Sequence, residues 1–161
     1  MPLYLLTHQR ELERPSNTGR LVLDELAQYA NLQVIRLQWQ RKNPDPHLVQ
    51  LAEQQKLWLL YPASEPTEAV VRPEPLCWAS QHWVLLDATW QESQKMLRQS
   101  PYLQQAKRLS LPASHSAYLL RRNQQAGALC TAEVVVQLLA LSGWPEQGAA
   151  LAQRFRDFNH R

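Results

Sequence analysis

The sequence predicts an α/β domain with a mostly parallel sheet and helices on both faces. Three observations lead to this fold class. Short apolar runs alternate along the chain with amphipathic segments, which is typical of consecutive strand and helix units. Several of the apolar runs are too short for helices and are bounded by proline or a charged residue, as in strands covered on both faces. The length of 161 residues allows a single domain, 1–161, with a substantial core.

The first expected elements are a strand, a helix and a second strand. Residues 3–7 (LYLLT) form a short apolar run, which is typical of a buried strand. Residues 19–30 follow a helical period, and the expected core face of this helix is Leu21, Leu23, Leu26, Ala27 and Ala30. Residues 32–39 (LQVIRLQW) are rich in branched and aromatic side chains and are expected to form the next strand.

A short helix and two more strands are expected in the middle of the chain. Residues 46–55 have a helical pattern, and their inward side chains are expected to be Leu48, Leu51 and Ala52. Residues 57–62 (LWLLYP) and 83–88 (WVLLDA) are apolar runs of strand length. The segment between these strands is predicted to be mainly loop because it contains Pro66, Pro73 and Pro75.

The last third of the chain repeats the alternation. A helix is expected to run to about Gln99, where Pro101 stops it, and residues 107–111 (KRLSL) are expected to form a strand. Residues 131–143 are predicted to form a helix that ends at its glycine. Residues 145–160 are predicted to form a final helix with proline at its first position.

Composition limits the class of protein. Apolar residues make up 45% of the chain and charged residues 19%, which indicates a globular domain, and the net charge of +3 permits a polyanionic partner without requiring one. No window approaches a membrane span and the start of the chain lacks the features of a signal peptide, so we expect a soluble, cytoplasmic protein. Two distant cysteines and five histidines lack metal-ligand spacing, so no metal site is expected.

The strongest candidate site is the junction between the strand at 83–88 and the helix that follows. Thr89 and Glu92 have the spacing of a capping box. Asp87 ends an apolar strand, so it must lie either in a cleft or in a salt bridge. Trp90 is either part of the core or a platform for stacking. Because ligands of parallel sheets bind beyond the carboxyl ends of the strands, this junction is a candidate active site.

Two other segments carry candidate functional residues. In RPSNTGRL (14–21), several side chains suit a helix N-terminus and Arg20 suits a phosphate, although a single glycine argues against a dinucleotide loop. A capped helix without any ligand explains the same residues. Cys130 stands at the start of a second helix, and a nucleophilic role would need a partner base that the sequence does not supply.

Five motifs in order give the chain a resemblance to a known family. RPSNTGRL, LLYPAS, LLDATWQESQKMLRQSPYL, SAYLLRR and CTAEVV resemble the DTW-domain family, the tRNA-uridine aminocarboxypropyltransferases, and the similarity extends from about Leu3 to Phe158. The resemblance implies transfer of the 3-amino-3-carboxypropyl group of S-adenosylmethionine to N3 of a tRNA uridine, with release of methylthioadenosine. It also implies a SPOUT-like fold with a C-terminal trefoil knot, tRNA as partner, no metal, and a monomer or homodimer.

The resemblance also assigns roles to residues. Asp87 is the candidate catalytic group, which accepts or orients the imino proton of the uridine. The residues expected to bind S-adenosylmethionine or to support that site are Ser64, Leu86, Thr89, Trp90, Thr131 and Glu133. Ser16, Asn17 and Arg20 are expected to face the substrate or the methionine carboxylate of the cofactor. The residues expected to meet tRNA phosphates are Lys95, Arg98 and Arg121.

The chain departs from the family pattern at two points. Related sequences commonly carry a cysteine-rich N-terminal segment, whereas this chain has no cysteine before Cys77 and begins at the first strand. If tRNA docking depends on that segment, the expected consequence is weaker tRNA binding, another RNA or a protein partner. Ala88 stands where glycine is frequent, which matters only if the backbone there has a positive φ.

Two other functions fit the same residues. A SPOUT-type RNA methyltransferase would use the same cofactor and release S-adenosylhomocysteine in place of methylthioadenosine. A non-catalytic RNA-binding module would show salt-sensitive RNA binding without affinity for the cofactor.

Overall fold

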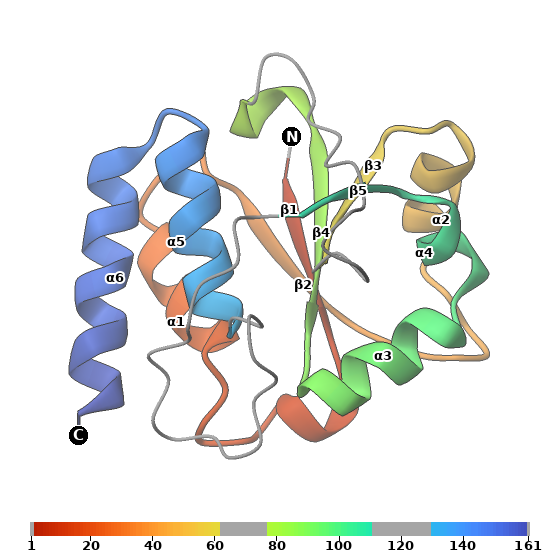
Figure 1. Cartoon of the computed structure of the whole chain (residues 1–161), viewed down its shortest axis with the longest axis horizontal. Helices are drawn as coiled ribbons and strands as arrows, with labels where there is room; N and C mark the ends of the chain where they lie inside the picture. Colours follow the sequence, from red (N-terminus) through yellow and green to blue (C-terminus); the bar gives the residue numbers. More distant parts are fainter. Residues whose placement is uncertain (1, 62–76, 111–129, 161) are drawn as a thin grey trace.

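A five-stranded sheet lies at the centre of the computed structural model, which describes residues 2–61, 77–110 and 130–160 (Figure 1). The strands are β1 (Leu3–Thr7), β2 (Val34–Gln38), β3 (Leu57–Leu60), β4 (His82–Asp87) and β5 (Lys107–Leu109). Their spatial order is β2-β1-β4-β3-β5, and each neighbouring pair is parallel. The predicted parallel α/β architecture is therefore confirmed.

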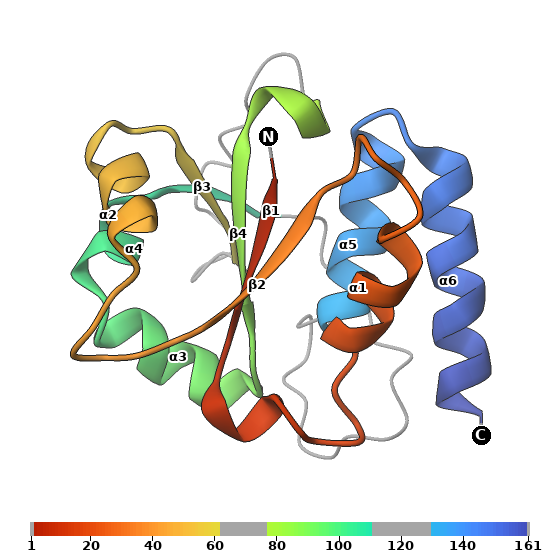
Figure 2. The same cartoon turned by 180° about the vertical axis from the view of Figure 1, so that it is seen from behind.

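Helices cover both faces of this sheet, as predicted. The helices α1 (Gly19–Leu26), α5 (Thr131–Leu141) and α6 (Pro145–Asn159) lie on one side, and α2 (Pro46–Glu53), α3 (Trp90–Arg98) and α4 (Pro101–Gln105) lie on the other (Figures 1 and 2). Two short 3-10 helices, η1 (Gln9–Glu11) and η2 (Trp78–Ser80), follow β1 and precede β4.

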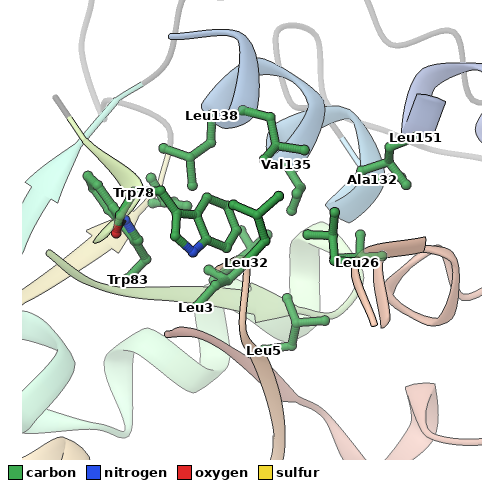
Figure 3. Packing of buried hydrophobic residues seen from close by; sticks show 14 of the residues in the cluster. Leu3, Leu5, Leu26, Leu32, Trp78, Trp83, Ala132, Val135, Leu138 and Leu151 are labelled. Atoms are coloured by element: carbon green, nitrogen blue, oxygen red, sulfur yellow. Dashed lines mark hydrogen bonds between the residues drawn. The ribbon is translucent and has the colours of Figure 1, made fainter. Parts of the chain in front are cut away.

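The strands β1, β3 and β4 each contribute to two separate cores. Leu3 and Leu5 of β1 pack with α1, α5 and α6, whereas Tyr4 and Leu6 pack with α2, α3 and α4. This alternation explains why the strands are apolar at consecutive positions. Figure 3 shows the first core, where the fully buried Trp78 and Trp83 lie among side chains of β1, α1 and α5.

The order of the strands places a topological switch between β1 and β4. The chain leaves β1 through α1, on one face of the sheet, and leaves β4 through α3, on the other face (Figure 1). The two strands are nevertheless neighbours, and their last residues, Thr7 and Asp87, are paired in register. Ligands of open α/β sheets bind at such a point, at the carboxyl ends of the strands.

The boundaries of several elements agree with the sequence. Pro145 is the first residue of α6, and Gly143 follows α5 with a φ of +91°, in the left-handed region that suits glycine. The three residues expected to face inward from α2, Leu48, Leu51 and Ala52, are buried.

The core face predicted for the first helix is correct for Leu26 and in part for Leu21 and Leu23, which pack against the first core, and wrong for Ala27 and Ala30. Helix α1 ends at Leu26, and Val22 and Leu26 are buried there, whereas Leu21 and Leu23 are half-buried and Ala27 is exposed; Ala30 is also exposed. The helix packs against α6 as well as the sheet, and this contact buries Glu25, whose carboxylate lies 2.8 Å from Nε of Arg154. Glu25, a charged residue, therefore belongs to the buried face of α1, which the apolar pattern assigned to leucine and alanine alone.

The sequence reading also missed helix α4. Pro101 does follow the end of α3, as expected, but it begins a new helix. Proline suits this first position because its fixed φ matches a helix and its missing N–H has no partner there in any case. Tyr102 and Leu103 of α4 are buried against the second core.

The path of the chain around α5 is described only in part. The knot expected at this end depends on residues 111–129, which connect β5 to α5 and lie outside the described residues. The SPOUT-like arrangement and the trefoil knot therefore stay predictions. None of the helices in the described ranges is long and apolar enough to cross a membrane.

Candidate functional site

Asp87 lies at the switch between β1 and β4 and is 1% exposed. Its Oδ1 accepts hydrogen bonds from Nδ2 of Asn17 at 2.8 Å and Oγ1 of Thr131 at 3.0 Å. Its Oδ2 accepts hydrogen bonds from Oγ1 of Thr7 at 3.0 Å and Nη2 of Arg36 at 2.9 Å. We call Asp87 and these donors the Asp87 cluster. It joins β1, β2, β4, the start of α5 and the loop before α1.

Asn17 connects the Asp87 cluster to a second buried carboxylate. Its Nδ2 donates to Glu11 at 2.9 Å as well as to Asp87, and its Oδ1 accepts from Nη2 of Arg36 at 2.7 Å and from the amide of Arg20 at 3.1 Å. Glu11 also forms an ion pair with Arg14. These contacts determine the orientation of the Asn17 amide. Its NH2 group faces the two carboxylates, and its oxygen faces the guanidinium of Arg36 and a backbone amide.

The N-termini of two helices meet the carboxylate of Asp87. A Cβ built on Gly19, the first residue of α1, would lie 2.8 Å from Cγ and 3.0 Å from Oδ1 of Asp87. Thr131 is the first residue of α5, and the amide of its neighbour Ala132 donates to Oγ1 of Thr18 at 3.1 Å. Because helix N-termini carry partial positive charge, both helices stabilise a carboxylate at this position.

These contacts answer one of the questions that the sequence left open. Asp87 lies in a salt bridge with Arg36. A carboxylate has about four acceptor positions, and here each oxygen already accepts two hydrogen bonds. The assignment of Asp87 as the proton acceptor stays a prediction, and its geometry favours a positioning role over direct proton transfer. Among the described residues, no three His, Cys, Asp or Glu side chains are arranged to hold a metal ion.

The capping box at the start of α3 is present as predicted. The amide of Glu92 donates to Oγ1 of Thr89 at 3.2 Å, and the amide of Thr89 donates to Oε1 of Glu92 at 3.0 Å. Ala88 is not among the described residues with a positive φ, so alanine is compatible with the backbone at this position. Thr89, which was expected to support the cofactor, thus has a structural role in holding the start of α3.

Glu92 is expected to make stability depend on pH. Burial raises its pKa, but the hydrogen bonds from Thr89, together with the nearby His8, hold the pKa below the ordinary value of 4.5. Because the folded pKa is the lower one, this contribution is complete above about pH 4.5 and is lost as the pH falls through the folded value. Glu92→Gln keeps an acceptor, so at pH 7 it should cost about 1 kcal/mol or less.

Urea unfolding of wild type and Glu92→Gln at pH 7 and pH 3 would measure this effect. The difference in unfolding free energy should be largest at pH 7 and should become smaller as the pH falls below about 4.5. Glu53→Gln, at an exposed position at the end of α2, is the matched control for the substitution itself. An unchanged difference across this range would contradict the role of the ionised carboxylate.

Two stacked aromatic pairs lie at the same edge of the sheet. Tyr61, directly after β3, stacks on Trp90 with ring centroids 5.7 Å apart and an angle of 25° between the rings. His8, directly after β1, stacks on Trp39, directly after β2, at 5.9 Å and 21°. Trp90 is half-buried, so it is neither a fully buried core residue nor a fully exposed one.

Cys130 is unsuited to a nucleophilic role. Burial and the nearby carboxylate of Glu133 raise the pKa of its thiol well above the ordinary value. A thiol with a raised pKa is protonated at neutral pH and therefore unreactive. The amide of Cys130 donates to Oε1 of Glu133 at 3.0 Å, so Glu133 serves the start of α5.

The match to a family model covers the whole chain. The model of the DTW domain matches residues 1–161. The chain belongs to the DTW-domain family. No solved structure matches this chain at a significant level. Membership in the family is consistent with a role in tRNA modification.

The structure of the DTW domain brings part of the predicted site together. Asn17, Asp87 and Thr131, from three separate motifs, are joined by hydrogen bonds. Leu86 is buried in the core next to α2, α3 and α4, so its side chain does not face this site. Ser16 is half-buried in the segment that leads to Asn17. Ser64 and Arg121 lie outside the described residues.

The predicted RNA-facing cations within the described residues have exposed side chains, and the backbone amide of Arg20 donates to Oδ1 of Asn17 in the Asp87 cluster. Arg20 is exposed, and its Nη2 donates to the carbonyl oxygen of Pro15 at 3.0 Å. Lys95 and Arg98 are exposed on α3. The role of each in RNA binding, and that of Trp90 in cofactor binding, stays a prediction.

Sequence reasoning missed several members of the site. Thr7, Glu11, Gly19 and Arg36 were not singled out as site residues. Arg36 could have been found, because a charged residue inside the apolar strand 32–39 requires a partner. No local signal marks Glu11 or the contact of Gly19 with Asp87, since both depend on how distant segments pack.

Proposed function

We propose that this DTW domain transfers the 3-amino-3-carboxypropyl group of S-adenosylmethionine to N3 of a tRNA uridine. A bond forms between N3 and Cγ of the methionine part, and the bond between this carbon and sulfur breaks with its electron pair remaining on sulfur. The proton of N3 is released to solvent, and methylthioadenosine leaves as a neutral thioether. The proposal extends the coarser role in tRNA modification and includes the SPOUT-like, knotted arrangement of the family.

The observation that carries the proposal is the convergence of the family's motifs on one carboxylate. Asn17 comes from RPSNTGRL, Asp87 from the segment that contains DATW, and Thr131 from CTAEVV. Asn17 donates directly to Asp87 although the two residues are 70 positions apart in the sequence. They meet at the carboxyl ends of β1 and β4, where open parallel sheets bind ligands.

The residues at this edge fit a cofactor that carries a carboxylate. The guanidinium of Arg36 is held by Thr7, Asn17 and Asp87 through Nε and Nη2. Within residues 2–61, 77–110 and 130–160, Nη1 of Arg36 makes no hydrogen bond, and the side chain is 19% exposed. We expect Nη1 to bind the carboxylate of the methionine part, because a fixed guanidinium is well suited to a carboxylate. The bound cofactor supplies the electrophilic carbon.

In this proposal the Asp87 cluster positions groups for the reaction. It holds Arg36 against β1 and sets the positions of α1 and α5 relative to the edge of the sheet. Misplacement by about 1 Å is enough to reduce the rate of an oriented reaction by about 100-fold. Proton acceptance by Asp87 itself would require one of its present donors to give way.

The direct test is incubation of the purified protein with S-adenosylmethionine and unmodified tRNA. Mass spectrometry reads both the small-molecule product and the modified nucleoside. Methylthioadenosine together with an aminocarboxypropyl-uridine is the expected result. S-adenosylhomocysteine with a methylated nucleoside would instead establish a methyltransferase, and the absence of both products with intact RNA binding would favour a non-catalytic module.

Thr131→Val tests the positioning role within this assay. The substitution keeps the shape of the side chain and removes one of the hydrogen bonds to Asp87, so it should cost about 1 kcal/mol of stability. We expect kcat/KM to fall by about tenfold to 100-fold. The matched control is Ser142→Ala, which removes a buried hydroxyl at the other end of α5, where its Oγ donates to Leu138 at 2.6 Å. Equal activities of the two variants would contradict the positioning role.

A further inference from the structure

The outward face of α3 is polar and cationic. Gln91, Lys95 and Arg98 are exposed and are spaced four and three residues apart, so they form one stripe along the helix. The acidic residue of this helix, Glu92, is turned toward its capping partner Thr89. The exposed stripe therefore carries two positive charges and no carboxylate.

An aromatic pair lies beside the start of this stripe. Tyr61 stacks on Trp90 at 5.7 Å, and the guanidinium carbon of Arg108 lies 5.5 Å from the centre of the Tyr61 ring. Burial raises the pKa of Tyr61, while a hydrogen bond with Ser93 of α3 and the charges of Arg108 and Arg98 act to lower that pKa. Tyr61 thus lies along α3, between aromatic and cationic groups.

We propose that this surface, which we call the α3 platform (Tyr61, Trp90, Lys95, Arg98 and Arg108), binds a single-stranded segment of the RNA substrate. Lys95 and Arg98 contact phosphates, and a base next to the target uridine stacks on Trp90. The stacked ring of Tyr61 holds the indole of Trp90 in place. Aromatic side chains combined with a cationic track are how proteins bind single-stranded nucleic acid. This inference rests on the proposed function, because it assigns the RNA side of that site.

The position of Trp90 links the platform to the chemistry. Trp90 is the first residue of α3 and lies three residues after Asp87, the last residue of β4. A base stacked on Trp90 would bring the adjoining nucleotide to the carboxyl edge of the sheet. The resemblance to the family assigns Trp90 to the cofactor, so RNA binding and cofactor binding must be measured separately.

The experiment measures the affinity for a 12-nucleotide oligouridylate at several salt concentrations, without S-adenosylmethionine. Trp90→Ala should weaken binding at least fivefold, and Trp90→Phe should restore part of the loss, because stacking contributes about 1–3 kcal/mol per base. Lys95→Gln/Arg98→Gln should reduce the slope of log affinity against log salt by about 1.4, since each phosphate contact on a single strand contributes about 0.7.

A matched double variant controls for net charge. Lys56→Gln/Arg156→Gln removes two exposed cations before β3 and on α6, and its slope should equal that of wild type. Thermal unfolding of each variant verifies that it is folded. The inference is overturned if Trp90→Ala binds the oligonucleotide as wild type does, or if both double variants reduce the slope equally.

The same variants separate this inference from the proposed function. If Trp90→Ala weakens binding of S-adenosylmethionine and leaves RNA affinity unchanged, Trp90 is part of the cofactor site. The proposal that the α3 platform binds RNA is then wrong. If the platform variants lose RNA affinity but wild type transfers no aminocarboxypropyl group, the platform stands and the proposed reaction fails.

Discussion

Asp87→Ala is expected to lower the free energy of unfolding by about 3–5 kcal/mol, which is a large part of the stability of a domain of this size. The substitution leaves the guanidinium of Arg36 without its carboxylate in a site where Asp87 itself is 1% exposed. It also removes the acceptor for Thr7, Asn17 and Thr131, and each buried donor left without a partner adds to the cost.

Urea unfolding of wild type, Asp87→Ala, Asp87→Asn and Asp24→Ala would measure this loss. Asp24 is exposed on α1, and its substitution should change stability by about 0.5 kcal/mol or less. Asp87→Asn should be intermediate, because it keeps the volume and one acceptor but turns an NH2 group toward existing donors. A cost below about 1 kcal/mol for Asp87→Ala would show that the hydrogen bonds to Asp87 contribute little.

This expectation affects how activity data are interpreted. An inactive Asp87→Ala protein reports loss of folding as readily as loss of a catalytic group. Thr131→Val is the more informative variant, since it removes one hydrogen bond to Asp87 and leaves the carboxylate, the ion pair with Arg36 and the shape of the site in place.

Gly19→Ala is the second substitution with a large expected effect. The added Cβ would lie 2.8 Å from Cγ of Asp87 and 3.0 Å from its Oδ1, closer than unstrained contacts allow. Because Asp87 is held from several sides, it cannot move away without breaking hydrogen bonds. The expected loss is about 1–3 kcal/mol, as for other overpacked sites, despite the higher helix propensity of alanine.

The matched control for Gly19→Ala is Gly148→Ala in α6. There the nearest atoms to an added Cβ are the carbonyl oxygen of Val136 at 3.2 Å and Cβ of Leu139 at 3.4 Å. These contacts are tight but tolerable, and the gain in helix propensity offsets them, so stability should change by about 1 kcal/mol or less.

A double-mutant cycle identifies the cause of the Gly19 effect. In an Asp87→Ala background the carboxylate is gone, so Gly19→Ala should cost less than it does in wild type by about 1 kcal/mol or more. Equal costs in both backgrounds would show that the strain at Gly19 does not come from Asp87.

Local signals were sufficient for most of the strands and helices and for several helix starts. The capping box of Thr89 and Glu92 was predicted correctly because its hydrogen bonds join residues three apart. The start of α6 at Pro145 was also predicted correctly, since proline at a first helical position is a local preference. The core face of α1 was predicted only in part, because the contact of Glu25 with Arg154 joins residues 129 positions apart.

The sequence by itself determined the α/β class, the order of most strands and helices along the chain, and the place of Asp87 at the end of a buried strand. The periodicity of apolar residues and the preferences of capping residues act over a few positions, so they can be recognised in a single sequence. Only the tertiary structure decided which groups surround Asp87. Its partners Thr7, Arg36 and Thr131 are 80, 51 and 44 residues away. Parallel pairing of β1 with β2 and β4 brings Thr7 and Arg36 to Asp87, and the packing of α5 against the sheet brings Thr131 there. A carboxylate buried by such packing must find its donors among residues that no local pattern connects.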